Sequence, residues 1–238
     1  MSRILVTGGA KRLGAQICLA LAQAGYSVVV HYRSSKSEAD AVAHACSNYG
    51  VEAEVIQGDF STSQGLNDFF NRFFERFSSL HGLINNVGNY FVGSAVHTLI
   101  DKWLELFQLN LNAPVELIQK LLPFLMATQG SIINIGVSGL NRNGANTYCT
   151  AYMLAKESLW GLTRSLSLEL AEARVKVNMI SPGLLENSVD LQENISEVPF
   201  KRAGSCEEVA RVITFLLDPK NEYITGQNIE IAGGFGLK

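Results

Sequence analysis

Short apolar runs alternate with stretches of helical period along the whole chain, and this alternation constrains the fold more than any other feature. The apolar runs cover residues 3–6, 26–32, 52–57, 81–86, 130–135, 175–180 and 227–232. The helix-period stretches lie near residues 13–24, 37–49, 63–78, 101–127, 150–172 and 206–217. Neighbouring parallel strands need a right-handed crossover connection, which is usually a helix. We therefore predict a single doubly wound α/β domain over residues 1–238, with about seven parallel strands and helices on both faces of the sheet.

The bulk composition fits such a domain and narrows the classes of partner. A chain of 238 residues that is 47% hydrophobic can bury a full core. A net charge of −3 argues against a nucleic-acid partner, which would require a basic face. No apolar run approaches the roughly 18 residues that span a membrane, and the N-terminal stretch MSRILVTGG lacks a signal-peptide core. The cysteines form no CxxC pair, so we expect a cytoplasmic protein without a metal site.

A glycine-rich turn, TGGAKRLG, occupies residues 7–14 directly after the first apolar run. Glycines let the backbone approach a pyrophosphate, and the helix that follows directs its first N–H groups at the same charge. Ligands of a doubly wound sheet bind beyond the carboxyl ends of its strands. The turn therefore predicts a dinucleotide site of the Rossmann type. The contacts expected from it are Gly8, Lys11, Arg12, Leu13 and Gly14.

The second apolar run ends in a basic and hydroxyl-rich segment, HYRSS. A site for NAD usually carries an acid here that binds the ribose 2′-OH, yet the first acidic residue of the chain is Glu38. A 2′-phosphate requires cations and hydroxyl or amide donors instead. We therefore predict NADP(H), with Arg12, Arg33 and Ser34 around the phosphate; the alternative is that Arg33 is an ordinary solvated charge. The residues expected to contact the cofactor here are His31, Tyr32, Arg33 and Ser34.

The third apolar run leads into GDF, which places Asp59 and Phe60 at the same edge of the sheet. Asp59 is expected to accept a hydrogen bond from the exocyclic amine of adenine. The alternative is a turn aspartate that caps the helix following Ser61.

The helix-period stretch that begins near residue 150 carries an acid-base pair. Tyr152 and Lys156 are one helical turn apart and share a face. A phenol with an ordinary pKa near 10 must be shifted by about 3 units, or about 4 kcal/mol, to exchange protons readily at neutral pH. A nearby ammonium in a partly dry cleft favours that shift, so the pair predicts acid-base catalysis.

Taken together, the motifs resemble the short-chain dehydrogenase/reductase family over essentially the whole chain. They are TGGAKRLG (7–14), NNVG (85–88), LNLNAP (109–114), a serine at 138, YMLAK (152–156) and SPG (181–183). The resemblance implies that Tyr152 delivers a proton to the substrate, that Lys156 binds the nicotinamide ribose and lowers the tyrosine pKa, and that Asn110 holds a relay water. It also implies cofactor contacts from Asn86, Val87, Gly88, Pro182 and Gly183. The alternatives are a buried amide at Asn110 that braces adjacent strands and a simple turn at 182–183.

The position of the catalytic serine departs from the family pattern. Members usually carry it thirteen residues before the tyrosine, where this chain has Gly139. Ser138 lies one residue earlier, whereas counting forward from the fifth apolar run places Val137 at that position. Ser138 is the candidate for polarising the substrate carbonyl, and the choice between Ser138 and Val137 stays open.

The second departure, Arg12 in place of the middle glycine, resembles the pteridine reductase branch and its dihydromonapterin reductase relatives. In that branch an aromatic residue at the position of Tyr90 stacks on the flat pterin, and the alternative here is an aromatic plug in the pocket wall. The branch commonly carries an aspartate where this chain offers Val137 or Ser138. The expected activity is NADPH-dependent reduction of a small C=O or C=N substrate, as in pteridine reductases.

The sequence is also compatible with two other functions. A 3-oxoacyl-acyl-carrier-protein reductase fits Ser138 better, but residues 123–130 carry no cation and residues 184–199 carry acids only, which an acidic carrier protein would not favour. Residues 184–199 are also the expected substrate lid. A non-catalytic NADP(H) sensor conflicts with intact Tyr152, Lys156 and Asn110.

Apolar residues on more than one face of 101–127 and 150–172 indicate a homo-oligomer, and the resemblance implies a homotetramer.

Overall fold

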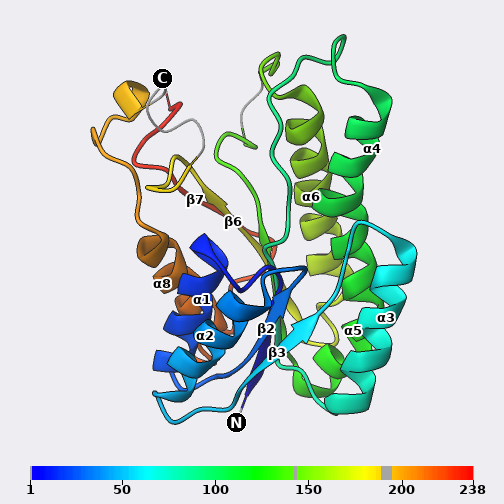
Figure 1. Cartoon of the computed structure of the whole chain (residues 1–238). Helices are drawn as coiled ribbons and strands as arrows, with labels where there is room; N and C mark the ends of the chain where they lie inside the picture. Colours follow the sequence, from blue (N-terminus) through cyan, green and yellow to red (C-terminus); the bar gives the residue numbers. More distant parts are fainter. Residues whose placement is uncertain (1, 142–143, 189–194, 238) are drawn as a thin grey trace.

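A central parallel sheet with helices on both faces forms the protein, as Figure 1 shows for the computed structural model. The structure describes residues 2–141, 144–188 and 195–237. Within them seven strands form one parallel sheet in the order β3-β2-β1-β4-β5-β6-β7. The strands are β1 (Arg3–Val6), β2 (Ser27–Tyr32), β3 (Ala53–Gln57), β4 (Gly82–Asn85), β5 (Ser131–Ile135), β6 (Lys176–Pro182) and β7 (Asn228–Ile231). The predicted doubly wound α/β fold is confirmed.

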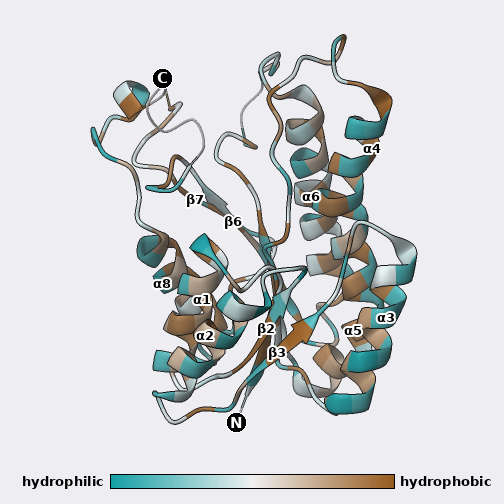
Figure 2. Ribbon diagram, viewed as in Figure 1, coloured by the Kyte–Doolittle hydropathy of each residue, from teal (hydrophilic) through white to brown (hydrophobic). Residues whose placement is uncertain are grey.

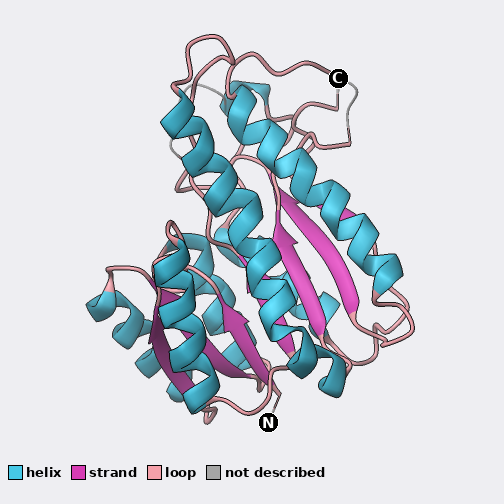
Figure 3. Cartoon of the chain, turned by 90° about the vertical axis from the view of Figure 1, so that its right-hand side faces the viewer, coloured by secondary structure: helices cyan, strands magenta, loops and turns pink. Residues whose placement is uncertain are grey.

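The helices form two layers around this sheet. They are α1 (Arg12–Gln23), α2 (Lys36–Ser47), α3 (Ser63–Arg76), α4 (Ile100–Phe107), α5 (Ala113–Thr128), α6 (Thr150–Glu169) and α8 (Cys206–Leu217), with a short 3₁₀ turn at Ile195–Glu197. Helices α1, α2 and α8 share one apolar cluster, and α3 and α5 share another on the opposite face. Figure 2 shows hydrophobic residues along the strands and on helix surfaces toward the sheet, and Figure 3 shows one helical layer in front of the strands. Burial of these two clusters is the main favourable contribution to folding.

The predicted helix at 101–127 differs from the observed structure. Helix α4 ends at Phe107, a π-helical turn follows at Gln108–Asn112, and α5 continues from Ala113. A π turn holds one residue more than an α turn, so it shifts the phase of the apolar pattern between α4 and α5. This shift explains part of the apolar character that the sequence showed on more than one face.

Two loops at the carboxyl edge of the sheet are joined by an isolated parallel bridge. The Gly93 N–H donates to the Tyr148 carbonyl at 2.8 Å, and the Thr150 N–H donates to the Gly93 carbonyl at 3.1 Å. The segment after β4 is therefore fixed against the start of α6, where Tyr152 lies. No helix in the described part of the chain has both the length and the apolar character that membrane crossing demands.

Candidate active site

The glycine-rich turn connects β1 to α1 and leaves no room for side chains at its glycines. Gly8 has a φ of 62°, in the left-handed region, and a Cβ at Gly14 would lie 2.1 Å from the Gly8 carbonyl oxygen. Arg12 also has a positive φ, 49°, a conformation that costs a residue with a side chain roughly 1–2 kcal/mol. Backbone this close to a helix N-terminus fits the phosphates of a dinucleotide.

A small cavity of about 140 Å³ lies next to this turn. Its walls come from the carboxyl ends of β1 to β4 and from the π turn: Gly8, His31, Arg33, Gly58, Asp59, Phe60, Val87, Asn89 and Leu109. Most of these are residues that the sequence predicted around the adenosine half of the cofactor. The donor set and the close backbone therefore fit a dinucleotide.

The residues predicted around the 2′-phosphate do not all line the same cavity. Arg33 lines the small cavity, whereas Arg12 lines a second and larger one. Lys11 forms an ion pair with Glu38, 2.7 Å from Nζ to Oε1, and Ser34 is exposed. A joint role for Arg12, Arg33 and Ser34 at the 2′-phosphate stays a prediction. The side chains of two other expected contacts, Leu13 and Tyr32, pack against the core cluster of α1 and α2.

His31 and Phe60 are buried and stack on each other, each 2% exposed, with ring centroids 4.0 Å apart and planes 7° from parallel. Both ring nitrogens of His31 are hydrogen-bonded to backbone groups, those of Gly8 and Gly58. Burial lowers the pKa of His31 to about 4. His31 lines the small cavity, where a cofactor contact was expected, but both of its ring nitrogens are already hydrogen-bonded within the protein.

Asp59 also has partners inside the protein. Its Oδ1 accepts from the Ser61 N–H at 3.0 Å and from the Ser61 hydroxyl at 2.7 Å, and these bonds hold the Asp59 pKa below its usual range. Helix α3 is capped by Thr62, whose hydroxyl accepts from the Gly65 N–H at 3.0 Å. Asp59 is therefore a turn aspartate, as in the alternative interpretation, but the cap of α3 is Thr62; Asp59 also lines the small cavity.

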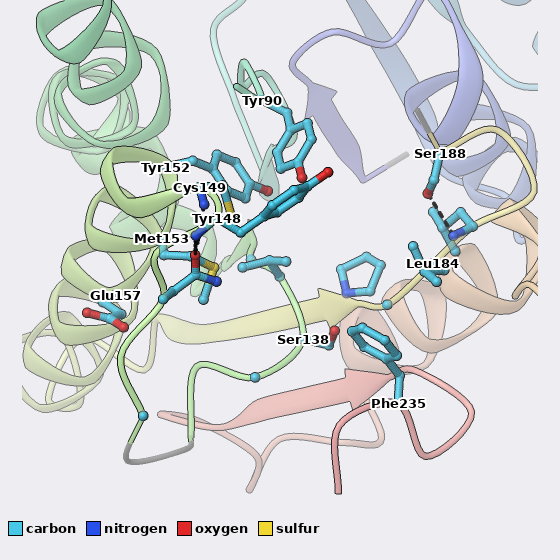
Figure 4. A pocket seen from close by; sticks show the side chains of 18 of the residues that line it. Tyr90, Ser138, Tyr148, Cys149, Tyr152, Met153, Glu157, Leu184, Ser188 and Phe235 are labelled. Atoms are coloured by element: carbon cyan, nitrogen blue, oxygen red, sulfur yellow. Dashed lines mark hydrogen bonds between the residues drawn. The ribbon is translucent and has the colours of Figure 1, made fainter. Parts of the chain in front are cut away.

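The larger cavity, about 610 Å³, lies among the loops that follow β4, β5, β6 and β7, and Figure 4 shows the side chains around it. It brings together Arg12, Tyr90, Ser138, Tyr152, Pro182 and Gly183, which the sequence predicted as site residues. The rings of Tyr90 and Tyr152 meet edge to face, with centroids 5.0 Å apart and planes at 90°. Tyr90 is therefore part of the wall beside the expected proton donor.

Several lining residues escaped the sequence reasoning. They include Tyr148, Cys149, Glu157 and Phe235. Phe235 follows the last strand, so the rule that ligands bind beyond strand carboxyl ends could have found it. Tyr148 and Cys149 immediately precede α6, and their only signal was proximity to Tyr152.

Ser138 lines the cavity, but it does not lie next to Tyr152. In Figure 4 Ser138 and Tyr152 lie at separate parts of the cavity wall. The Ser138 N–H donates to the Pro182 carbonyl at 2.9 Å, toward β6, whereas Val137 packs against an apolar cluster that includes Leu159 of α6. Both Val137 and Ser138 line the cavity, and the role of Ser138 in polarising the carbonyl stays a prediction.

Tyr152 and Lys156 lie one helical turn apart on α6, and both have shifted pKa values. Lys156 is 4% exposed, its Nζ donates to the Ile135 carbonyl at 2.7 Å, and burial lowers its pKa to about 8. Its Nζ lies 5.8 Å from the Tyr152 ring centroid. Burial, with the nearby Cys149 thiol, raises the Tyr152 pKa. Lys156 is not among the causes of this shift, and its predicted lowering of the Tyr152 pKa stays a prediction.

Asn110 lies in the π turn with its side chain fully buried. Its Nδ2 donates to the carbonyls of Asn89 and Leu106, each at 2.9 Å, so the amide does brace the backbone. Its Oδ1 has no hydrogen-bond partner within the described residues. A Cβ at Gly88 would lie 2.4 Å from this Oδ1 and 3.4 Å from the Lys156 Nζ. An acceptor without a partner close to Lys156 fits the predicted relay water.

The remaining predicted contacts are placed as follows. Asn86 donates from Nδ2 to the Thr7 carbonyl at 2.9 Å, which holds the glycine-rich turn from the β4 side. Of the expected lid at 184–199, residues 189–194 lie outside the described residues. Four residues of its first part line the larger cavity: Leu184, Leu185, Asn187 and Ser188.

Known proteins resemble this chain over nearly its whole length. Residues 8–236 match the family described as enoyl-(acyl carrier protein) reductase. A 3-oxoacyl-[acyl-carrier-protein] reductase of Staphylococcus epidermidis is 32% identical over 97% of each chain. The crystal structure of acetoin dehydrogenase from Salmonella typhimurium superposes with a TM-score of 0.90 at 27% identity, over 99% of this chain and 96% of that one. A blue fluorescent protein from a metagenomic library, solved in complex with NADPH, gives a TM-score of 0.91 at 26% identity, over 99% and 98%.

Proposed function

This chain belongs to the short-chain dehydrogenase/reductase family of NAD(P)-dependent oxidoreductases, and from this premise we propose that it reduces the carbonyl group of a ketone substrate with NADPH. The observation that carries the proposal is the phenol of Tyr152 at the wall of the larger cavity, one helical turn from the buried Lys156. Such a phenol keeps its proton at neutral pH and can donate it to a carbonyl oxygen.

The proposed reaction adds a hydride to the carbonyl carbon and a proton to the carbonyl oxygen. A reduced nicotinamide, when bound, would supply the hydride that the carbonyl carbon accepts. Tyr152 donates its proton to the carbonyl oxygen, which becomes the hydroxyl of the product. Lys156, still largely an ammonium below pH 8, then returns a proton to Tyr152 through a water held at the Asn110 Oδ1. The glycine-rich turn and the small cavity would hold the adenosine half of the cofactor.

A preference for NADPH over NADH is supported by charge. Arg33 lines the small cavity, and no acid precedes Glu38 in the chain. A carboxylate at the end of β2 would repel a 2′-phosphate, whereas a guanidinium attracts it. We expect Arg33→Ala to raise the KM for NADPH at least about tenfold while the KM for NADH changes little, a loss of about 1.4 kcal/mol toward the phosphate. Equal effects on both cofactors would contradict this preference.

The 3-oxoacyl thioesters are the first substrate class to test. A curated 3-oxoacyl-[acyl-carrier-protein] reductase shares 32% identity with nearly the whole chain. A flat heteroaromatic ring such as a pterin, which the sequence favoured, becomes the second candidate. The observation in its favour is Tyr90, which meets the Tyr152 ring edge to face inside the cavity.

The deciding experiment follows NADPH oxidation with acetoacetyl thioesters, dihydrobiopterin, dihydrofolate and small diketones, using Tyr152→Phe as the inactive control. Turnover of the thioesters or diketones supports the proposal. Turnover of pterins alone replaces it with the second candidate. Binding of NADPH without turnover of any compound would leave a non-catalytic sensor and refute both.

We also propose a homotetramer. The start of α4 and the segment before it expose a row of large apolar side chains: Val96, Leu99, Ile100 and Leu104. Such a row on a free monomer is costly, and another copy of the chain would cover it. Light scattering coupled to size-exclusion chromatography should give four times the chain mass, and a monomer would refute the assembly.

A further inference from the structure

The imidazole of His31 lies beneath the small cavity and connects two of its walls. The Gly8 N–H donates to Nδ1 at 3.0 Å, and Nε2 lies 3.0 Å from the Gly58 carbonyl oxygen. Gly8 belongs to the turn after β1, and Gly58 follows β3, so the ring spans the end of β2 between them. Both glycines line the cavity.

Only one protonation state of His31 can make both hydrogen bonds. A carbonyl oxygen can only accept, so Nε2 must carry the hydrogen that is donated to Gly58. Nδ1 must then be bare, because it accepts from the Gly8 N–H. The neutral ring with its hydrogen on Nε2 satisfies both partners, whereas an imidazolium would present a donor to a donor.

The backbone of His31 adds a third bond to the same turn. The Gly9 N–H donates to the His31 carbonyl at 2.8 Å. Two successive N–H groups of the glycine-rich turn therefore end on one residue, where Gly8 is in the left-handed conformation. Without these bonds the turn would keep much of the conformational freedom that glycines have.

Aromatic contacts fix the plane of the imidazole. Phe60 stacks on one face at 4.0 Å, and the Phe69 ring meets the imidazole edge on at 5.6 Å and 89°. Phe60 itself lines the small cavity, next to Asp59. Three walls of the cavity, Gly8, Gly58 and Phe60, thus depend on the orientation of one buried ring.

We propose that His31 is a positioning residue that holds the glycine-rich turn and the end of β3 at the spacing required by the adenosine half of the dinucleotide. This inference rests on the proposed cofactor, but not on the identity of the carbonyl substrate. Residues that preorganise a site act on the affinity for its ligand. His31 should therefore govern dinucleotide binding and leave the chemical step unchanged once the cofactor is bound.

Three substitutions separate the contacts of His31. His31→Phe keeps an aromatic ring on Phe60 and removes both ring hydrogen bonds. His31→Asn keeps an acceptor near the position of Nδ1, and His31→Gln keeps a donor near the position of Nε2. Folding of each variant is checked by circular dichroism, and NADPH binding is measured by fluorescence titration, which needs no substrate.

We expect the Kd for NADPH to rise at least about tenfold in His31→Phe, since a backbone donor loses its partner at about 1.4 kcal/mol or more. His31→Asn should stay within about threefold of the wild type. At saturating NADPH, kcat and the KM for the carbonyl substrate should be close to wild-type values in both variants. This split distinguishes a role in cofactor positioning from general damage to the fold.

The inference is overturned if folded His31→Phe binds NADPH as tightly as the wild type, or if His31→Asn is as weak as His31→Phe. If His31→Phe does not fold, the other pair decides: tighter binding by His31→Asn than by His31→Gln supports the inference, and the reverse overturns it. A wild-type protein that binds NADPH but reduces no carbonyl would refute the proposed function alone. If the wild type binds NADH instead, the same comparison is made with NADH.

Discussion

Acidification should unfold this protein in part through a single buried imidazole. Burial lowers the pKa of His31 from 6.5 to about 4 in the folded chain, although its hydrogen bond to Gly58 and the charge of Asp59 both act in the opposite direction. A shift of roughly 2.5 units corresponds to about 3 kcal/mol, at 1.36 kcal/mol per unit. The folded state excludes the proton that an unfolded chain would bind to this ring.

The direction follows from proton linkage. Between about pH 6.5 and pH 4 the unfolded chain binds more protons at this position than the folded chain, so stability rises with pH across that window. The contribution of about 3 kcal/mol is complete above about pH 6.5 and is lost as the pH falls toward 4. Asp59 is the carboxylate whose charge acts on His31. It stays ionised over most of this pH window because its hydrogen bonds with Ser61 hold its own pKa low.

The assay is urea unfolding followed by circular dichroism at closely spaced pH values, for the wild type and for His31→Phe. Other titrating groups, including His81, whose pKa burial also lowers, are present in both proteins and cancel in the difference. Between about pH 7 and pH 4 we expect the free energy of unfolding to fall by about 3 kcal/mol more in the wild type than in the variant. If the free energies of unfolding of the two proteins change in parallel with pH, the reasoning is refuted, because protonation of His31 would then not be coupled to unfolding.

Further predictions concern the larger cavity. Tyr152→Phe should lower kcat at least about hundredfold without changing the Kd for NADPH, as expected for loss of a general acid, and near-normal turnover would contradict the mechanism. The pH profile of kcat/KM should fall on the alkaline side near pH 8, where Lys156 loses its proton, and Lys156→Arg should move this limb to higher pH because arginine stays charged. Ser138→Ala should cost less than about fivefold in kcat, because Ser138 and Tyr152 lie at separate parts of the cavity wall, whereas a loss of about a hundredfold would support its predicted role. Gly88→Ala should lower kcat at least about tenfold, because its Cβ would lie 2.4 Å from the Asn110 Oδ1; unchanged kinetics would show that the acceptor is not used.

The strands and the location of the site could be predicted from the sequence because they follow from periodicity. Alternating apolar runs and helical stretches specify parallel strands, and parallel strands collect their carboxyl ends at one edge. This rule predicts Gly8 and Asp59 at the ligand-binding edge, where both line the small cavity. Tyr90 and Pro182, which the family resemblance implies, line the larger cavity. The rule predicts where strands end, because the direction of a strand is set by the backbone.

The direction and surroundings of single side chains could not be predicted in the same way. Arg12 and Arg33 share one edge of the sheet but line different cavities. His31 belongs to the segment HYRSS, yet strand alternation turns its side chain into the core. The raised pKa of Tyr152 depends on the loss of hydration around it, which spacing alone does not reveal. The π turn was missed because a single extra residue leaves helical propensity unchanged.

That π turn makes the length of the chain between α4 and α5 a strict requirement. Adding or removing one residue within Gln108–Asn112 would rotate α4 by about 100° about its axis relative to α5. The rotation would carry the exposed apolar row of α4 away from its present direction and withdraw the Asn110 Oδ1 from Lys156. Over evolutionary time this segment should therefore accept exchanges of residue type outside Asn110, but neither insertions nor deletions, even though a surface loop would tolerate both.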